Sequence, residues 1–561
     1  MRTRFVGWFV LVLGVVLAAV MAPILWQLIA GSLTEGMLVD SRVWTLENFR
    51  ELFGDSSNIH AAVNTVVFAI GSALLAILIG GTQAWLAERT NAPFRTLAYL
   101  GAVILIGTPY LVYVISWTLI LGRNGLVNSI LGQLTGSDNP SIITVNSLPG
   151  MIFIEGLIWS PLAFLLIVSA FKRANPALEE AAQMSGAGTF TVLRRITLPL
   201  AWPAILAVGL LAFVRVMEAF EVPAIVGLPG GVEVVTTKVY QTIRRGITPD
   251  YGFANALSVT LMLVVGVLLW RYNRLSKRAE RYQVVSGEAY RPGVMDFGRW
   301  RYAYGAVSVV LFGILVALPI VVLAWAAFVP VFQGFNSSMF NFVLQNFRWA
   351  LSTPSLVEGA MNTILLCAIA SVAASLITCL VAWLVVRRTP ASALLDQLVS
   401  VPLIIPGIVV GIAIAQVGLA SPIPVYGTIW ILMFGYFVTF LPFTMRFAYA
   451  GVIQIRADLE EAALVSGASR FRLFVRVVLP LLATSLLTGG IFAFMQGARA
   501  LSMPIFLASP DSPVAAVSLY DAFVNGSTTQ VAAFGLLWML VMVTMSGLIF
   551  AFAKRSNVSL Y

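Results

Sequence analysis

The chain has 561 residues, of which 59% are hydrophobic and only 10% are charged. Soluble domains carry about 25% charged residues, so this composition predicts a protein of the lipid bilayer. One histidine (His60) and two cysteines (Cys367 and Cys379) exclude a His/Cys metal cluster, a disulfide scaffold and most histidine-based catalysis. The net charge of +10 does not indicate nucleic-acid binding, because the basic residues lie in short loops between apolar runs.

The sequence contains twelve apolar runs that are long enough to cross the hydrocarbon core as helices, which takes about 20 residues. In chain order they are residues 5–30, 61–86, 97–121, 148–171, 200–222, 253–270, 302–329, 361–386, 395–420, 428–449, 481–498 and 531–553. The first run lacks a small-residue cleavage site and exceeds the apolar length of a signal peptide, so we expect it to remain as an anchor. The predicted fold is an all-α integral membrane protein with about 12 transmembrane helices.

The loops between these runs differ in charge. One alternating set, which includes both ends of the chain, carries about three times as many arginines and lysines as the other set. By the positive-inside rule, both termini are predicted to be cytoplasmic. The long basic segment 271–301 is expected to be a cytoplasmic linker between two six-helix domains, residues 1–270 and residues 302–561.

A repeated segment relates the two predicted domains. Residues 178–199 read LEEAAQMSGAGTFTVLRRITLP, and residues 459–480 read LEEAALVSGASRFRLFVRVVLP. The same spacing also places Pro161 on Pro442, in the fourth run of each half. Both halves therefore have the same topology, as in a parallel repeat about an axis along the membrane normal. Each copy lies between the fourth and fifth runs, on the predicted cytoplasmic side.

Each copy is expected to form two short helices joined by a left-handed turn at Gly186 or Gly467. The first helix of each copy has small residues through which another protein could approach the backbone, and paired carboxylates that could anchor basic residues of a partner. These residues are Glu179, Glu180, Ala181 and Ala182 in the first copy, and Glu460, Glu461, Ala462 and Ala463 in the second.

The pattern E-A-A-x3-G-x9-I-x-L-P in these segments resembles the signature loop of permease subunits of binding-protein-dependent ABC importers. The first copy matches it with Glu180, Ala181, Ala182, Gly186, Ile196, Leu198 and Pro199; the second matches it with Glu461, Ala462, Ala463, Gly467, Leu479 and Pro480, with Val477 in place of isoleucine. The resemblance implies two tandem permease domains in a bacterial inner (plasma) membrane, whose loops couple to two copies of an ATPase subunit. It also implies an external substrate-binding protein, either periplasmic or lipid-anchored.

The length of the chain and the linker AERYQVVSGEAYRP before GRWR are most similar to the ferric-iron transport group of these permeases. Related permeases for thiamine, polyamines, sulfate or aminoethylphosphonate leave the substrate open. No G-x4-G-K-[ST] nucleotide-binding loop is present. We therefore expect the chain to be no enzyme and to bind no cofactor of its own, with ATP and magnesium held by the partner ATPase.

The translocation pathway is expected between the halves, where prolines interrupt helices and expose backbone polar groups. Proline is more often a simple kink, which is the alternative interpretation. The interrupted third and fourth runs contain Pro109, Pro161, Pro402, Pro406 and Pro442.

Ionisable residues in the fifth runs are candidates for the pathway or for an outer gate, because charges at membrane depth are usually functional. Arg215 and Glu218 could form a structural pair near the outer interface, or Glu218 could pair with Arg499 across the two halves. The full candidate set is Arg215, Glu218, Glu221, Gln496 and Arg499.

An alternative of another class is a twelve-helix secondary transporter driven by an ion gradient, which also has a six-plus-six repeat. Such a transporter does not need a repeated docking loop and often hides a carboxylate deep in a span, where we expect none. Cys367 and Cys379 are predicted to be packing residues and His60 has no evident partner, so any iron specificity is expected to reside mainly in the binding protein.

Overall fold

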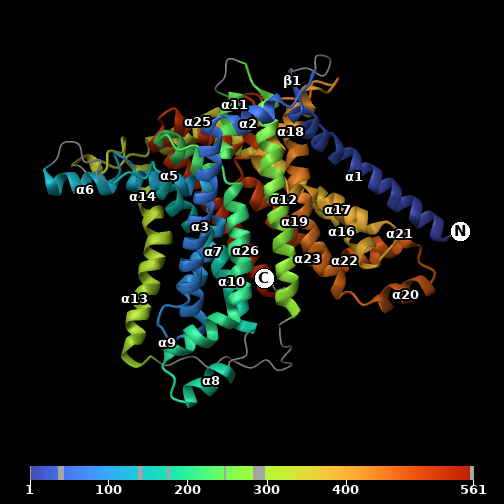
Figure 1. Ribbon diagram of the computed structural model, residues 1–561, viewed down its shortest axis with the longest axis horizontal. Helices are drawn as coiled ribbons and strands as arrows, with labels where there is room; N and C mark the ends of the chain where they lie inside the picture. Colours follow the sequence, from blue (N-terminus) through green and yellow to red (C-terminus); the bar gives the residue numbers. More distant parts are fainter. Residues whose placement is uncertain are drawn as a thin grey trace.

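The structure, a computed structural model, describes residues 2–35, 43–136, 143–173, 177–244, 248–281, 297–335 and 337–555. The chain is a bundle of helices with one small antiparallel sheet, β1 (Thr34–Glu35) and β2 (Val43–Trp44) (Figure 1). The centre of the predicted linker, residues 282–296, lies outside the described residues, as do Met1 and residues 556–561. The predicted positions of the two ends therefore stay predictions.

The first half comprises α1–α12 with three short turns of π or 3-10 type. They are α1 (Arg2–Ser32), α2 (Glu47–Gly54), α3 (Ser56–Arg89), α4 (Leu97–Gly107), α5 (Tyr110–Leu121), α6 (Leu126–Thr135), α7 (Leu148–Arg173), α8 (Ala177–Met184), α9 (Thr189–Val192), η2 (Leu193–Thr197), α10 (Leu198–Met217), η3 (Pro223–Gly227), η4 (Leu228–Gly230), α11 (Val235–Arg244) and α12 (Tyr251–Arg281).

The second half has a similar order but no counterpart of α6 between α18 and α19. Its elements are η5 (Gly298–Trp300), α13 (Arg301–Phe312), η6 (Gly313–Ala317), α14 (Leu318–Phe328), η7 (Ser337–Phe340), α15 (Gln345–Ser352), α16 (Pro354–Val386), α17 (Ser392–Ser400), η8 (Val401–Leu403), α18 (Gly407–Leu419), α19 (Ile429–Gln454), α20 (Ala457–Val465), α21 (Arg470–Leu473), η9 (Phe474–Val478), α22 (Leu479–Leu481), α23 (Ala483–Ala498), α24 (Pro504–Leu507), α25 (Ala515–Val524) and α26 (Thr528–Arg555).

The predicted all-α membrane fold is confirmed. In the described part of the chain, ten helices are long and apolar enough to cross a bilayer, or up to twelve if each of two bent pairs is one span. The sixth span, α12, continues to Arg281, so its last residues fall within the range predicted as linker.

Both third spans are broken, as expected from their prolines, whereas the fourth spans α7 and α19 continue through Pro161 and Pro442, so the expected interruption there is wrong. Pro109 is the N-cap of α5 and Pro406 is the N-cap of α18. Proline has no N–H and restricts the residue before it, which ends the preceding helix. In the second half the two pieces meet at a bend of 103°.

The fifth spans also differ from the prediction. α10 ends at Met217, short of the predicted 222, and Pro223 then begins the separate turn η3. In the second half the helical segments on either side of Leu482 meet at a bend of 69°. Only the fifth span of the first half ends earlier than predicted, since α23 ends at Ala498, the last residue of the predicted run.

Small residues allow the spans within each half to pack closely. A Cβ on Gly80 of α3 would lie 2.6 Å from the backbone nitrogen of Phe164 and from the carbonyl oxygen of Ser160 in α7. Such backbone contact is typical of helices that associate in membranes. Cys367 and Cys379 are fully buried in α16, as predicted for packing residues.

Four asparagines at matching positions hold the loops at one end of the two halves; we call them the asparagine clasps. Asn48 in α2 and Asn346 in α15 each donate two hydrogen bonds to the carbonyls that end the first span of their half. Asn64 in α3 and Asn362 in α16 each donate one to the segment before α11 or α25. Their acceptors are the carbonyl oxygens of Ser32, Thr34, Glu233, Ala327, Val329 and Pro513.

Candidate functional site

A cavity of about 470 Å³ lies between the two halves. Its walls come from α4, α5, α7 and α10 of the first half and from η8, α18, α19 and α23 of the second. Every ionisable or amide residue predicted for the pathway lines it, and so do three of the five predicted prolines. These residues are Arg215, Glu218, Glu221, Gln496, Arg499, Pro161, Pro402 and Pro442. The other two prolines, Pro109 and Pro406, cap the helices that follow the two breaks.

Arg215 and Glu218 form the predicted ion pair, with 3.0 Å between Nη1 and Oε2. Glu218 is the C-cap of α10, and only 10% of its side chain is exposed. The carboxylate is therefore buried and lines the cavity, and the predicted pair with Arg215 is confirmed. The early end of α10 leaves Glu218 within the molecule.

Arg499 links the halves, but to a partner that the sequence did not predict. Its guanidinium donates to the carbonyl oxygen of Ile106 and to the Tyr110 hydroxyl, and it lies 4.4 Å from the centre of the Tyr110 ring. Of the two alternatives, the structural pair of Arg215 and Glu218 forms, and the pairing of Arg499 with Glu218 does not. Because α4 ends at Gly107, its last carbonyl groups accept no hydrogen bond from within the helix. The Arg499 guanidinium donates to one of them, that of Ile106.

Glu221 makes a second connection between the halves. Its Oε1 accepts hydrogen bonds from the backbone nitrogen of Leu501 and from the Ser502 hydroxyl, both at 3.2 Å. The side chain is buried and also lines the cavity. A carboxylate bonded to a backbone N–H at a buried contact fixes the spacing between the two halves there.

Glu155 is a cavity residue that the sequence reasoning missed. It lies in α7, is 5% exposed, and its Oε1 accepts from the indole nitrogen of Trp159 at 2.8 Å. It is the single acidic residue of the fourth apolar run, 148–171, so the rule for ionisable groups inside spans would have found it. The expectation that no carboxylate lies within a span is wrong.

The cavity thus holds three carboxylates against two guanidinium groups. The carboxylates are spread over the walls, and in the described part of the chain no group of three or more His, Cys, Asp or Glu residues could hold a metal ion. The cavity therefore has an acidic lining without the geometry of a metal-binding site.

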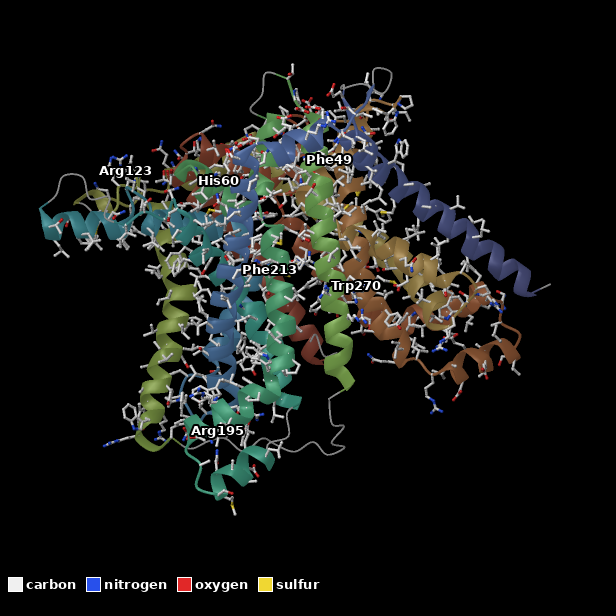
Figure 2. The ribbon with its side chains drawn as sticks, in the orientation of Figure 1. Phe49, His60, Arg123, Arg195, Phe213 and Trp270 are labelled. Carbon is white, nitrogen blue, oxygen red and sulfur yellow. The ribbon has the colours of Figure 1, made fainter. Side chains whose placement is uncertain are left out.

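In Figure 1, α8 lies at the bottom of the view and α20 at the lower right, both away from α2 at the top, which carries Asn48 of the asparagine clasps. Figure 2 shows Arg195, in the first loop, low in the same view and His60 near the top. The first short helix of each loop, α8 or α20, is followed by a glycine in the left-handed region, Gly186 or Gly467, with φ of 86° in both. The predicted turn is therefore confirmed in both copies.

The first glutamate of each loop is buried in an ion pair with the end of the second span. Glu179 lies 3.4 Å from Arg89 and accepts from the Thr197 hydroxyl at 2.8 Å. Glu460 accepts from Arg387 at 2.6 and 2.9 Å and from the Trp383 indole at 3.1 Å.

These two arginines also bind the end of the fourth span of their half. Arg89 donates to the carbonyl oxygen of Phe171, and Arg387 donates to that of Ile455. Glu179 and Glu460 are only 3% and 7% exposed, so the prediction that they anchor residues of a partner is wrong. They attach α8 and α20 to the spans instead. We call the two arrangements the loop ion pairs.

The outer surface of each loop is apolar at matching positions, which the sequence reasoning did not single out. Met184 and Val465 are 90% and 89% exposed, and Phe190 and Phe471 are 74% and 78% exposed. With Leu178 and Leu459, each 52% exposed, they form the two loop apolar triads.

The remaining predicted loop residues take two positions. Among the residues of α8 and α20, Ala181, Ala462 and Glu461 are exposed, while Glu180, Ala182 and Ala463 are half-buried. The residues of the L-P signature begin the fifth spans, where proline suits the first turn of a helix. These are Leu198 and Pro199 at the start of α10, and Leu479 and Pro480 at the start of α22.

Two segments of the chain, residues 73–281 and 374–558, match the family described as binding-protein-dependent transport system inner membrane component. The chain belongs to this family. It is a multi-pass inner-membrane permease subunit of a binding-protein-dependent ABC importer, with one matched segment in each half. The resemblance of the repeated loops is confirmed, and the alternative of a secondary transporter is not supported.

Curated relatives match most of the chain. The ferric transport system permease protein FbpB of Actinobacillus pleuropneumoniae is 26% identical over 523 residues, which is 90% of this chain and 73% of that protein. A putative ferric transport permease, FbpB 1 of Haemophilus influenzae, is 27% identical over 429 residues, 75% of this chain and 66% of that protein. A solved bacterial alginate ABC transporter chain is 23% identical, with a TM-score of 0.35, over 43% of this chain and 85% of that one.

Proposed function

We propose that this permease imports ferric iron and is driven by two separate ATPase subunits that dock on α8 and α20. ATP and magnesium are bound by those subunits, and this chain supplies the pathway and the two docking loops. The names of two relatives that match 90% and 75% of this chain support the substrate. The main support for the coupling role is the duplicated loop. In each copy, an apolar triad is exposed on its surface and a buried ion pair attaches it to the spans.

Each loop combines a surface for a partner with a firm attachment to the spans. Exposed apolar side chains at the centre of a patch are typical of protein interfaces. Nearly all of the surface of Met184 and Val465 is exposed, so burial of these side chains by a partner would make the binding free energy more favourable. Because the loop ion pairs attach these helices to the spans, displacement of a docked ATPase would move the spans as well.

The direction of movement follows from the contacts at the cavity. Glu221 and Arg499 hold the two halves together near the ends of the fifth spans. We propose that ATP binding draws the two loops together and breaks these contacts, which opens the cavity to a substrate delivered by an external binding protein. Hydrolysis then restores the present arrangement.

Iron passes through the cavity without being held at a fixed site. Ferric iron is a hard cation and prefers oxygen ligands, which the carboxylates of Glu155, Glu218 and Glu221 supply along the cavity wall. Their separation keeps any one contact weak, so the ion can leave again. Selection of iron over other solutes then rests mainly on the binding protein.

Uptake of radioactive iron into vesicles that contain this chain, its ATPase and its binding protein tests the proposal. Replacing the loop apolar residues (Met184→Ser with Val465→Ser) should abolish both iron uptake and co-purification of the ATPase. Charge reversal at Glu180 and Glu461 together should uncouple uptake in the same way. The matched control is Leu134→Ser, at a position on α6 that is 78% exposed and remote from the loops. Full uptake in the loop variants would contradict the coupling role.

The substrate is tested separately from the coupling. If the cognate binding protein takes up thiamine, a polyamine or another solute in preference to ferric iron, the iron assignment fails while the docking role stands. Fusion of a reporter that is active only in the cytoplasm to either terminus tests the proposed orientation, in which both termini are cytoplasmic.

A further inference from the structure

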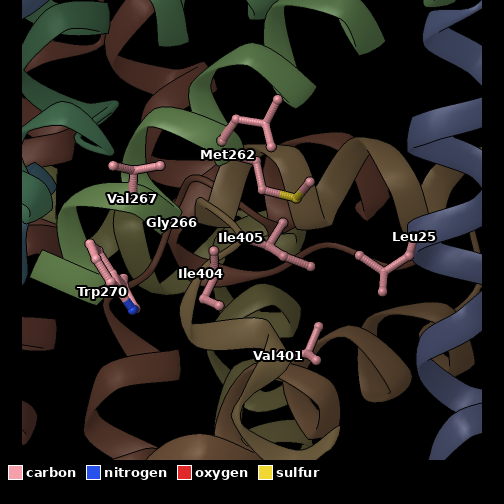
Figure 3. Close-up of a pocket in the computed structure, with 9 residues that line it drawn as sticks. Leu25, Met262, Gly266, Val267, Trp270, Val401, Ile404 and Ile405 are labelled. Atoms are coloured by element: carbon pink, nitrogen blue, oxygen red, sulfur yellow. The ribbon is translucent and has the colours of Figure 1, made fainter. Parts of the chain in front are cut away.

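A second cavity, of about 410 Å³, lies on the outer surface of the helix bundle, between α1, α12 and η8 (Figure 3). Apart from Gly266, all its lining side chains are hydrophobic. Leu25 comes from α1, Met262, Val267 and Trp270 come from α12, and Ile404 follows η8. We call this cavity the α1–α12 groove.

The groove exists because α1 and α12 cross at one end and separate at the other. At the crossing, a Cβ on Gly31 would lie 2.2 Å from the side-chain nitrogen of Asn255, so the two helices are in close contact. Below this point α1 leans away from α12 (Figure 1). Leu263, Val267 and Trp270 on the α12 side of the groove are 56–60% exposed. In a bilayer these side chains meet acyl chains rather than water.

The sixth span packs against the break of the third span in both halves. Gly107 and Ile404 each lie two residues before the proline that caps the next helix, so they occupy equivalent positions at the two breaks. A Cβ added to Gly107 would lie 3.0 Å from the Cβ of Ser546 in α26. The Ser546 hydroxyl also donates a hydrogen bond to the carbonyl oxygen of Val103. At Ile404 the facing residue of α12 is Gly266, and the groove opens beside it. α12 thus contacts the second break at Gly266 as α26 contacts the first at Gly107, and the groove lies beside the contact with α12.

The groove has a basic end. The guanidinium groups of Arg271 and Arg274 lie 6.0 and 5.5 Å from the ring of Trp270, which lines the groove. Both arginines are exposed. Tryptophan with basic residues at the end of a span is typical of the level of lipid headgroups, where arginine attracts anionic lipid. The charge at this end is thus complementary to a phosphate, and the apolar lining to a hydrocarbon chain.

We propose that the α1–α12 groove binds one anionic phospholipid, with an acyl chain against Ile404 and the headgroup phosphate between Arg271 and Arg274. The lipid supports the bend before Pro406. Ile405 lines both this groove and the cavity between the halves, so it separates the acyl chain from the translocation pathway. Lipid in the groove thereby supports one wall of that cavity.

Native mass spectrometry of the full chain tests this proposal, after exchange into phosphatidylglycerol or phosphatidylcholine with the same acyl chains. The wild-type chain should retain one phosphatidylglycerol on the order of 25-fold more strongly than phosphatidylcholine, since each of two arginines contributes about a factor of five. Arg271→Gln with Arg274→Gln should remove this preference. The matched control, Arg299→Gln in η5 with Arg301→Gln at the start of α13, should leave it unchanged.

A second variant separates the groove from the charges. Val267→Trp adds a large side chain to the groove wall and should lower the retention of both lipids. The proposal is overturned if the wild-type chain holds the two lipids equally, if the double arginine variant keeps its preference, or if Val267→Trp retains as much lipid as the wild type. A second copy of the chain retained in place of lipid would also overturn it.

Discussion

Removal of Arg387 should release α20 from the membrane spans. α20 has nine residues, and Glu460 is the only one of them that is buried. Helices this short are marginal by themselves, so the attachment of α20 depends on the contact between Glu460 and Arg387. Arg387→Met leaves the Glu460 carboxylate buried with only the Trp383 indole as a donor.

The size of the effect follows from the burial of the pair. Loss of one partner of a buried ion pair costs roughly 3–5 kcal/mol, and we take about 3 kcal/mol because the Arg387 side chain is 23% exposed. A change of that size raises the opening equilibrium of α20 on the order of 100-fold.

Hydrogen–deuterium exchange of the peptide that covers residues 457–465 measures this opening directly. In Arg387→Met the exchange of this peptide should accelerate, while that of the α8 peptide, residues 177–184, should not. The reciprocal variant Arg89→Met should show the opposite pattern. Unchanged exchange in α20, or an equal rise along the whole chain, would refute the reasoning. Arg387→Met combined with Glu460→Leu should recover part of the stability, because no buried charge is then left unpaired.

Three further predictions concern other contacts. Asn346→Leu leaves two buried carbonyls without a donor and should lower the free energy of unfolding by about 2 kcal/mol. The effect is measured as a lower midpoint in thermal unfolding of the detergent-solubilised chain. A midpoint within error of the wild type would contradict the role of the clasp. Glu221→Leu removes the acceptor for the Leu501 N–H and should open the cavity toward the outer side. Cysteines introduced into the cavity should then react faster with a membrane-impermeant thiol reagent added outside. Unaltered labelling would show that this contact does not close the cavity. Gly80→Val places side-chain carbons against the backbone at Phe164 and should prevent recovery of a monodisperse protein on size exclusion, while Gly54→Val, where nothing lies within 4 Å, should be tolerated.

The helices and the repeat could be predicted because the length of an apolar run and the similarity of two segments can both be read from the sequence without knowing any contact. The loops between the fourth and fifth spans were placed correctly for the same reason. Which prolines break a helix could not be predicted, since a proline within an apolar run fits a kink, as at Pro161, as well as a complete interruption, as at Pro109. Once a helix ends early, its free carbonyls change the pairing of nearby charges.

That effect explains why residues of the cavity were predicted but their partners were not. Arg499 bonds the carbonyl oxygen of Ile106, which is available only because α4 ends there. The role of Glu179 and Glu460 depends on Arg89 and Arg387, which lie far from them in sequence and meet them only in the folded chain. The sequence alone could not distinguish a carboxylate that faces a partner from one that faces its own spans.

The asparagine clasps bear on how a duplicated chain can diverge. Asn64 donates to the main chain of Glu233, and Asn362 donates to the main chain of Pro513. Since every residue type carries the same carbonyl group, mutation at the acceptor position leaves the bond intact. An asparagine kept at this position in each copy is then enough to preserve the contact, while the acceptor residues, Glu233 and Pro513, have become different.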